Sequence, residues 1–383
     1  MLPPADSPEL GRDELDSPSA QAAGGWPWLP RRRPALGVRA TAAPTMFFIL
    51  LGAALGPQGV DILTRTALIQ LQAVVWVALA VIGVLIGLGL AAIAADSARG
   101  TFLHGAIIAA TTITTITGGL YLLLDQAQIR LSENPLVASL LIGICASVSA
   151  ALQTGPGASA EVRRAARLAD LDDLPLLVLG VAIVAALAGE SVVLRFLMTI
   201  AAGGAIGLAG WLLFERARET ERGVFVTGAV LLLAGVGAYL GTSPLLSGCV
   251  ASLVWVRVPG AADRITARDL RTLQHPLLAL LLIIAGALVE WTAIGLWVTG
   301  YIVVLRFAAK LLASIVAARL ARVSPALLSI VLLQPGIMGI ALGLNAGLML
   351  GDDASWIVSV VTMSVMAAEL LAAFLPRDRG EAS

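Results

Sequence analysis

The sequence has very little lysine, cysteine, histidine and charge of either sign. Only one of its 25 basic residues is a lysine, Lys310, and only 13% of all residues are charged. The two cysteines, Cys145 and Cys249, lie in apolar runs and provide no disulfide framework. With two histidines, His104 and His275, the chain has no Cys/His cluster with metal-ligand spacing. It also has no nucleophile motif or phosphate-binding loop, so neither an enzyme nor a cofactor is expected.

Apolar residues are abundant instead, at 58% of the chain with a mean hydropathy of +0.91. This composition is typical of a polytopic membrane protein, whose main surroundings are a lipid bilayer. A net charge of zero gives no reason to expect nucleic acid as a partner. Residues 1–41 are rich in Pro, Gly, Ala and charge, which predicts a disordered cytoplasmic tail. Residues 42–376 are then the transmembrane domain, and 377–383 a second short cytoplasmic tail.

Apolar runs of membrane-spanning length, separated by short polar joints, predict an all-α protein with about twelve transmembrane helices. If the N-terminus is inside, 20 arginines fall at cytoplasmic joints and only three, Arg65, Arg130 and Arg195, at outer joints. This alternation follows the positive-inside rule and predicts a cell-membrane protein with both termini in the cytoplasm. The expected spans are 42–56, 67–95, 102–124, 135–153, 168–189, 191–214, 223–240, 243–257, 276–293, 294–318, 325–350 and 353–375.

Lys310 is expected deep inside the span 294–318. It precedes Arg319 by nine residues, which is about 13 Å along a helix that rises about 1.5 Å per residue. That depth is close to the centre of a hydrocarbon layer about 30 Å thick. A cation there requires a cavity or a carboxylate partner, so Lys310 indicates a functional site.

The expected partners of Lys310 are the adjacent carboxylates Asp172 and Asp173 in the span 168–189. They follow Arg164 by eight and nine residues, which places them about 12–13 Å from the same membrane face. Carboxylate oxygens are preferred ligands of a hard alkali cation, and one of two adjacent buried carboxylates can hold a proton when no cation is bound. If H⁺ and a cation compete for these oxygens, binding of one releases the other, which is the basis of antiport. Asp170 is expected at the cytoplasmic mouth of this site.

Two spans contain residues that favour an interruption of the helix. The span 135–153 has two serines near mid-depth, and 325–350 has a Gln-Pro-Gly sequence in its middle, where proline removes a backbone donor. Backbone groups freed at that depth must be buried in protein or line a cavity. Interrupted helices in corresponding places of two halves indicate the binding site of an inverted-repeat transporter. The residues expected to line the breaks are Ser147, Ser149, Gln334, Pro335 and Gly336.

Other interpretations of these residues are open at this point. Pro335 is also typical of a simple kink, and small serines of close helix packing. If the helix of the aspartates began at Leu168, they would favour its first turn as a cap. Lys310 also has a stem long enough to extend towards the cytoplasmic headgroups.

Three more charged residues lie within or at the ends of the spans. Arg306, one turn deeper than Lys310, is expected to bind either a carbonyl group or an acid. Glu369 in the last span is a secondary candidate for the ion path, as is Glu290 at the outer end of the span 276–293.

Three stretches, taken together in their order and spacing, resemble the monovalent cation/proton antiporters, in the branch of bacterial Na⁺/H⁺ antiporters and Kef-type potassium efflux proteins. The likeness covers roughly residues 46–376. It rests on LLGAALGPQGV near the start, AYLGTSPLLSGCVASLVW in the middle and LQHPLLALLLIIAGALVEW after it.

The resemblance implies two inverted repeats with two interrupted helices that cross, forming a mobile core domain and a dimerisation domain. It implies a homodimer that exchanges Na⁺ or K⁺ for H⁺ by alternating access and contains no metal other than the transported cation. By the same resemblance, Asp173 is the ion ligand and Asp172 the partner of Lys310.

Two departures from the family pattern affect these assignments. The break at 147–149 reads SVS and contains no acid, where the family usually has Thr-Asp or Ser-Ser-Thr, so the ion preference does not transfer. Kef-like members have an acid five residues before a proline, a spacing that Asp170 and Pro175 share, so Asp170 competes with Asp173. The alternative functions are a sodium-coupled organic-anion carrier of similar fold and a non-transporting regulatory or degenerate paralogue. The missing acid favours the paralogue.

Overall fold

The computed structural model describes residues 42–96, 99–127, 134–149, 159–187, 192–216, 219–256, 262–321, 323–351 and 355–374. All of them belong to one compact unit, Gly37–Asp378. The predicted tails, residues 1–41 and 377–383, lie outside the described residues. Within the described ranges the protein is entirely helical apart from turns and one isolated β-bridge, which confirms the all-α prediction.

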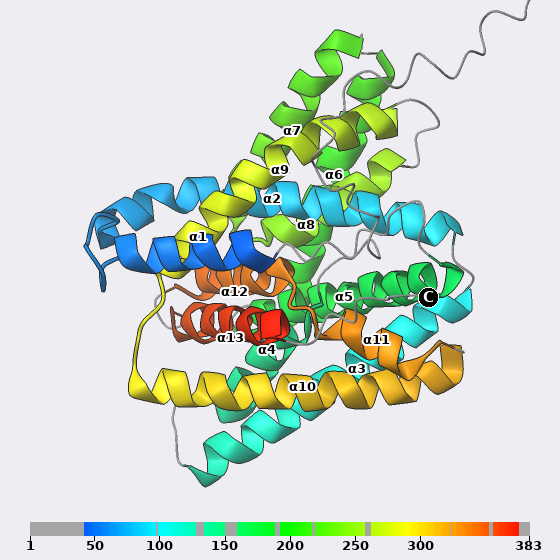
Figure 1. Ribbon diagram of the computed structural model, residues 1–383. Coiled ribbons are helices and arrows are strands. Elements are labelled where there is room, and N and C mark those ends of the chain that lie inside the picture. The colour runs from blue at the N-terminus through cyan, green and yellow to red at the C-terminus, as the bar shows by residue number, and fades with distance from the viewer. Residues whose placement is uncertain are drawn as a thin grey trace, which may run out of the picture. The chain divides into compact units, whose positions relative to one another are not determined.

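The described helices follow the predicted spans in order, and Figure 1 shows them as a packed bundle of long and short helices. Each predicted span overlaps one helix, except that 325–350 divides into two. How many helices cross a membrane, and whether they form inverted repeats, stay predictions. The helices are α1 (Ala42–Leu55), α2 (Arg65–Asp96), α3 (Arg99–Gln126), α4 (Pro135–Ser147), α5 (Ala160–Leu187), α6 (Val192–Arg216), α7 (Glu219–Leu240), α8 (Pro244–Val256), α9 (Ala262–Ala287), α10 (Ala293–Ala321), α11 (Pro325–Leu333), α12 (Ile337–Leu350) and α13 (Ser355–Phe374).

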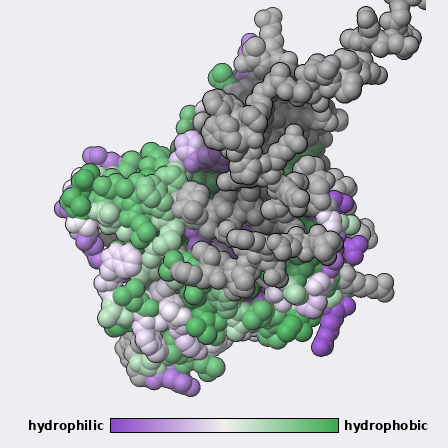
Figure 2. All heavy atoms as spheres, in the orientation of Figure 1, coloured by the Kyte–Doolittle hydropathy of each residue, from purple (hydrophilic) through white to green (hydrophobic). Residues whose placement is uncertain are grey.

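Several of the described helices have the length and apolar composition that crossing a bilayer requires. Five of them contain stretches long and apolar enough to span a membrane, in α2, α3, α6, α7 and α10, and six further apolar helices are shorter. Large apolar side chains such as Val193, Val224 and Val304 are exposed. Figure 2 shows apolar residues over much of the described surface on the face in view. A surface of this kind is stable against lipid and not against water.

The helices divide into two groups, each of which packs mainly within itself. The α2 group consists of α1, α2, α6, α7, α8 and α9, and the α10 group of α3, α4, α5, α10, α11, α12 and α13. The groups meet where α12 contacts α2, α8 and α9, where α13 contacts α1 and α9, and where α5 contacts α2, α6 and α8. In Figure 1, α4, α12 and α13 lie between α2 and α10. One apolar cluster joins both groups, including Leu79, Leu245, Leu281, Ile340 and Val358.

Two glycines allow α12 to lie directly against the end of α4. A Cβ atom on Gly336 would overlap the carbonyl oxygen of Ser149, and one on Gly339 would overlap that of Cys145. Both obstacles are backbone atoms, which cannot rotate away as a flexible side chain can. The absence of a side chain at these positions is therefore a packing requirement.

Replacing Gly336 with alanine is expected to lower the free energy of unfolding by about 1–3 kcal/mol, the usual cost of overpacking. The matched control is Gly235→Ala in α7, where an added Cβ meets nothing within 4 Å. Unfolding in mixed detergent–SDS micelles measures both variants. Equal midpoints for the two would show that α4 and α12 do not need this close approach.

Candidate functional site

The helices α4 and α11 both stop inside the α10 group instead of continuing across it. After Ser147, the α4 backbone becomes extended at Val148 (φ −61°, ψ 134°). After Leu333, the α11 backbone does the same at Gln334 (φ −66°, ψ 123°), and helix resumes as α12 at Ile337. The predicted interruption of the span 325–350 is therefore confirmed. The simple-kink interpretation of its proline is wrong, because the helix ends and begins again.

The two extended segments pair with each other across the breaks. Ser149 and Pro335 form an antiparallel bridge, and the Gly336 N–H donates to the Val148 carbonyl at 3.4 Å. This pairing satisfies part of the backbone that the interrupted helices leave free. It also brings together the serine and Gln-Pro-Gly motifs, which are far apart in the sequence.

Arg306 binds the carbonyl groups at the ends of both interrupted helices. It is buried, with 2% of its surface exposed. Its guanidinium donates to the carbonyls of Ala146 in α4 and of Val148 just after it, the latter at 2.7 Å, and to that of Gln334 after α11 at 3.4 Å. Helix C-termini leave carbonyls unpaired and carry partial negative charge, which a cation stabilises. Of the two partners expected for Arg306, the structure shows the carbonyl.

Replacing Arg306 with methionine is expected to lower the free energy of unfolding by about 3 kcal/mol or more. Three carbonyls lose a donor, and among the described residues only that of Val148 keeps another, the Gly336 N–H at 3.4 Å. Each buried unsatisfied group costs about 1–3 kcal/mol. Arg319→Met, an exposed change on the same helix, should stay within about 0.5 kcal/mol of the parent protein. Detergent–SDS unfolding of both variants is the measurement, and equal stability would exclude the capping role.

Lys310 forms a fully buried ion pair with Asp172. Its Nζ atom lies 3.0 Å from Asp172 Oδ2, and both side chains have 0% exposure. Lys310 also donates to the Ser149 hydroxyl at 2.7 Å, and that hydroxyl donates to Asp172 Oδ2 at 3.3 Å. The pairing predicted from the sequence is present, and the interpretation in which Lys310 extends to the headgroups is wrong. A buried ion pair is stable when additional hydrogen bonds of this kind offset the free-energy cost of removing both charges from water.

Asp173 lies beside the ion pair, and its position is held by the backbone of the α4 break. Its Oδ1 accepts the Ser149 N–H at 3.2 Å, and its side chain is half-buried. Because α5 begins at Ala160, the aspartates lie several turns inside the helix and not in its first turn. The helix-cap interpretation is therefore wrong. Asp172 Oδ1 is buried and has no hydrogen-bond partner.

The remaining predicted residues lie around this centre or apart from it. Ser147 is buried and donates to the Gly143 carbonyl one turn back in α4. Asp170 is half-buried, and its Oδ1 has no hydrogen-bond partner. Glu369 of α13 is 5% exposed and hydrogen-bonds Thr45 of α1 in the other helix group. Among the described residues, Glu369 forms no hydrogen bond or ion pair with the aspartates.

The sequence offered a carbonyl as one possible partner of Arg306, but it did not indicate which carbonyl groups bind the guanidinium. A backbone carbonyl is not marked by any residue type, so only the helix break itself signals that such a group is free.

Glu290, the other secondary candidate, lies in the connection between α9 and α10, where its backbone bonds Ser359.

The described helices and their buried charges define a multi-pass helical membrane protein with a charged site at two helix breaks. Among solved structures it is similar to the sodium/proton antiporter MjNhaP1 from Methanocaldococcus jannaschii, with a TM-score of 0.61 and 14% sequence identity. The match covers 86% of this chain and 89% of that chain. At this identity the likeness shows the fold. No protein-family model matches the sequence, and no curated protein sequence matches it.

Proposed function

We propose that the protein exchanges a monovalent cation, Na⁺ or K⁺, for H⁺ across the cell membrane by alternating access. The observation that carries this proposal is the buried pair of Lys310 and Asp172 beside a second carboxylate, Asp173. The fold shared with a sodium/proton antiporter supports it. We propose further that the protein is a homodimer with both termini in the cytoplasm, and that it acts as a transporter and not as an enzyme.

The charges at the site explain why cation and proton would be coupled. With all groups ionised, Asp172 and Asp173 balance Arg306 and Lys310. An alkali cation that enters this buried site adds an uncompensated charge, which is costly in surroundings of low polarity. Release of one proton restores the balance. The proton leaves Lys310, because a cation bound to Asp172 displaces the ammonium group that now occupies Oδ2.

In this proposal the two aspartates have different roles. Asp173 is the main oxygen ligand of the cation, because it is the more accessible carboxylate and is not occupied by Lys310. Asp172 exchanges its partner between Lys310 and the cation, and its unpartnered Oδ1 offers a second ligand atom. Asp170 attracts cations at the cytoplasmic mouth. Hard cations favour such oxygen ligands.

The test is ion exchange by the purified protein in proteoliposomes that carry an imposed pH gradient. A pH-sensitive dye should report proton movement when Na⁺, K⁺ or Li⁺ is added, with no response in protein-free liposomes. The absence of a dye response to all three cations would reject antiport and favour a non-transporting paralogue. Sodium-dependent uptake of an organic anion would identify the alternative carrier.

A further inference from the structure

A small cavity lies beyond the ion pair on the side predicted to face outwards. It is enclosed by α4, α5 and α12, and its lining is apolar, including Cys145, Gly180 and Leu342, except for the amide of Asn345. These residues lie outwards of the helix breaks and of the aspartates along their own helices. The volume of about 10 Å³ admits at most about one water molecule. In this structure the cavity is therefore too small to pass a hydrated cation.

Asn345 forms a buried hydrogen bond across the boundary between the two helix groups. The Ser243 hydroxyl, at the start of α8, donates to Asn345 Oδ1 at 2.9 Å, and the two residues are 0% and 1% exposed. The same hydroxyl accepts the Leu246 N–H at 3.2 Å. Since the amide oxygen of Asn345 can only accept, the hydroxyl proton is the donor in this contact. The hydrogen bond from the Leu246 N–H therefore holds the Ser243 hydroxyl in position to contact Asn345.

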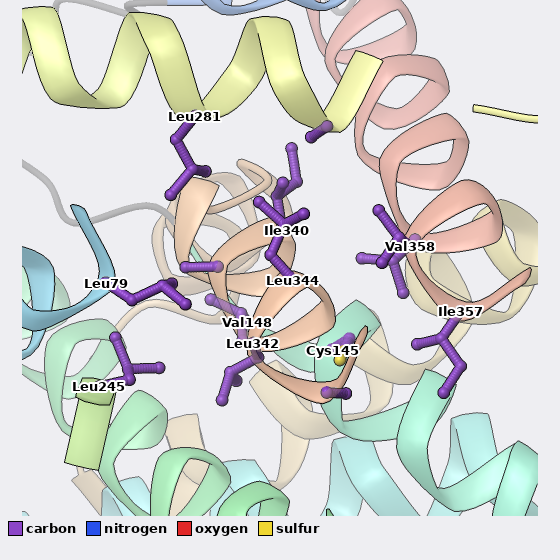
Figure 3. Packing of buried hydrophobic residues seen from close by; sticks show 14 of the residues in the cluster. Leu79, Cys145, Val148, Leu245, Leu281, Ile340, Leu342, Leu344, Ile357 and Val358 are labelled. Carbon is purple, nitrogen blue, oxygen red and sulfur yellow. The ribbon is translucent and has the colours of Figure 1, made fainter. Parts of the chain in front are cut away.

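Buried apolar residues are the sequence neighbours of both members of the pair, Leu245 and Leu246 after Ser243 and Leu344 and Ala346 beside Asn345. Figure 3 shows Leu79 of α2 and Leu245 of α8 facing Val148 and Leu342. Buried polar groups in such surroundings are costly unless they are paired or hydrated. The Ser243–Asn345 contact is therefore either closed and dry or open and filled with water. An apolar contact alone would not separate these two states so sharply.

We propose that Ser243 and Asn345 form a latch that closes the outer end of the ion path. Asn345 is then a positioning residue for transport and not an ion ligand. The inference rests on the proposed function, in which the α2 and α10 groups move relative to each other. When they separate at the outer end, the hydrogen bond breaks and the cavity widens to connect Asp173 with the outside.

The thiol of Cys145 lines the cavity and reports whether it is open. In a Cys249→Ser background it is the only thiol of the chain. Labelling by a membrane-impermeant cationic methanethiosulfonate is measured from the outer face of sealed vesicles. Asn345→Leu, which removes the amide at similar volume, should raise the labelling rate about fivefold, the factor that one net hydrogen bond provides.

Two control variants keep the latch intact. Ser243→Thr retains the hydroxyl, and Met349→Leu removes only the sulfur that Asn345 Nδ2 contacts at 3.7 Å, so both should label at the parental rate. Ser243→Ala should match Asn345→Leu and replaces it if that variant does not fold. Parental rates in both latch variants, with full labelling of Cys145 after denaturation, would overturn the proposal.

The labelling needs no transported ion, so the two proposals fail separately. Faster labelling of the latch variants, in a protein that exchanges no cation, would reject the proposed function and keep the latch. Cation exchange by the parent protein with unchanged labelling would reject the latch and keep the function.

Discussion

Asp173→Asn is expected to abolish cation-dependent proton movement, reducing the dye response to that of protein-free liposomes. The amide keeps an oxygen that can accept the Ser149 N–H, so the α4 break should remain intact. It has no charge to compensate a bound cation, however, so a cation no longer binds there or displaces the proton of Lys310. Exchange in proteoliposomes is the measurement, and an unchanged detergent–SDS unfolding midpoint shows that the protein is folded.

Asp170→Asn is the matched control, because it makes the same change three residues earlier on the same helix face. Exchange should persist, with an apparent cation affinity changed by no more than about fivefold, since a partly exposed charge contributes at most about 1 kcal/mol. The opposite result, with exchange lost in Asp170→Asn and kept in Asp173→Asn, would transfer the ligand role to Asp170.

Lys310→Met is expected to lower the free energy of unfolding by about 3–5 kcal/mol, the usual cost of removing one partner from a buried ion pair. The reason is that Asp172 is left charged and fully buried without its cation. The double variant Lys310→Met/Asp172→Leu should recover most of this loss, because two apolar side chains leave no uncompensated charge. Detergent–SDS unfolding of the single and double variants measures the difference.

Neither variant should exchange cations, because the pair is required for coupling in the proposed function. If the double variant is as unstable as the single one, the contribution of Lys310 comes from packing and not from charge. If Lys310→Met retains exchange at the parental rate, the proton does not leave from Lys310.

The sequence predicted helix positions well because the length of a run of apolar residues depends only on neighbouring residues in the chain. Each predicted span overlaps a described helix. The boundaries were less accurate where a helix continues past its apolar part. Thus α5 begins at Ala160 and α9 at Ala262, both before the predicted spans, because charged residues such as Arg163 and Arg264 extend a helix beyond the apolar layer without showing in hydropathy.

The sequence could identify the charged residues of the site but not all their partners. Lys310 and the two aspartates stand out because ionisable groups are rare in apolar spans. The carbonyls that bind Arg306, and the contact of Ser243 with Asn345, carry no such signal. Serine and asparagine occur in ordinary helix interiors, and which of them meet depends on how helices pack.

By itself, the sequence determined that the chain is an all-helical membrane protein with a lysine and a pair of aspartates at similar depth. Composition and periodicity suffice for this, since the bilayer requires long apolar helices and makes isolated charges conspicuous. Only the tertiary structure decided that Lys310 pairs with Asp172, that Ser149 holds Asp173, and that Arg306 joins the two breaks. These contacts link helices far apart along the chain, and their geometry depends on close approaches that no local pattern specifies.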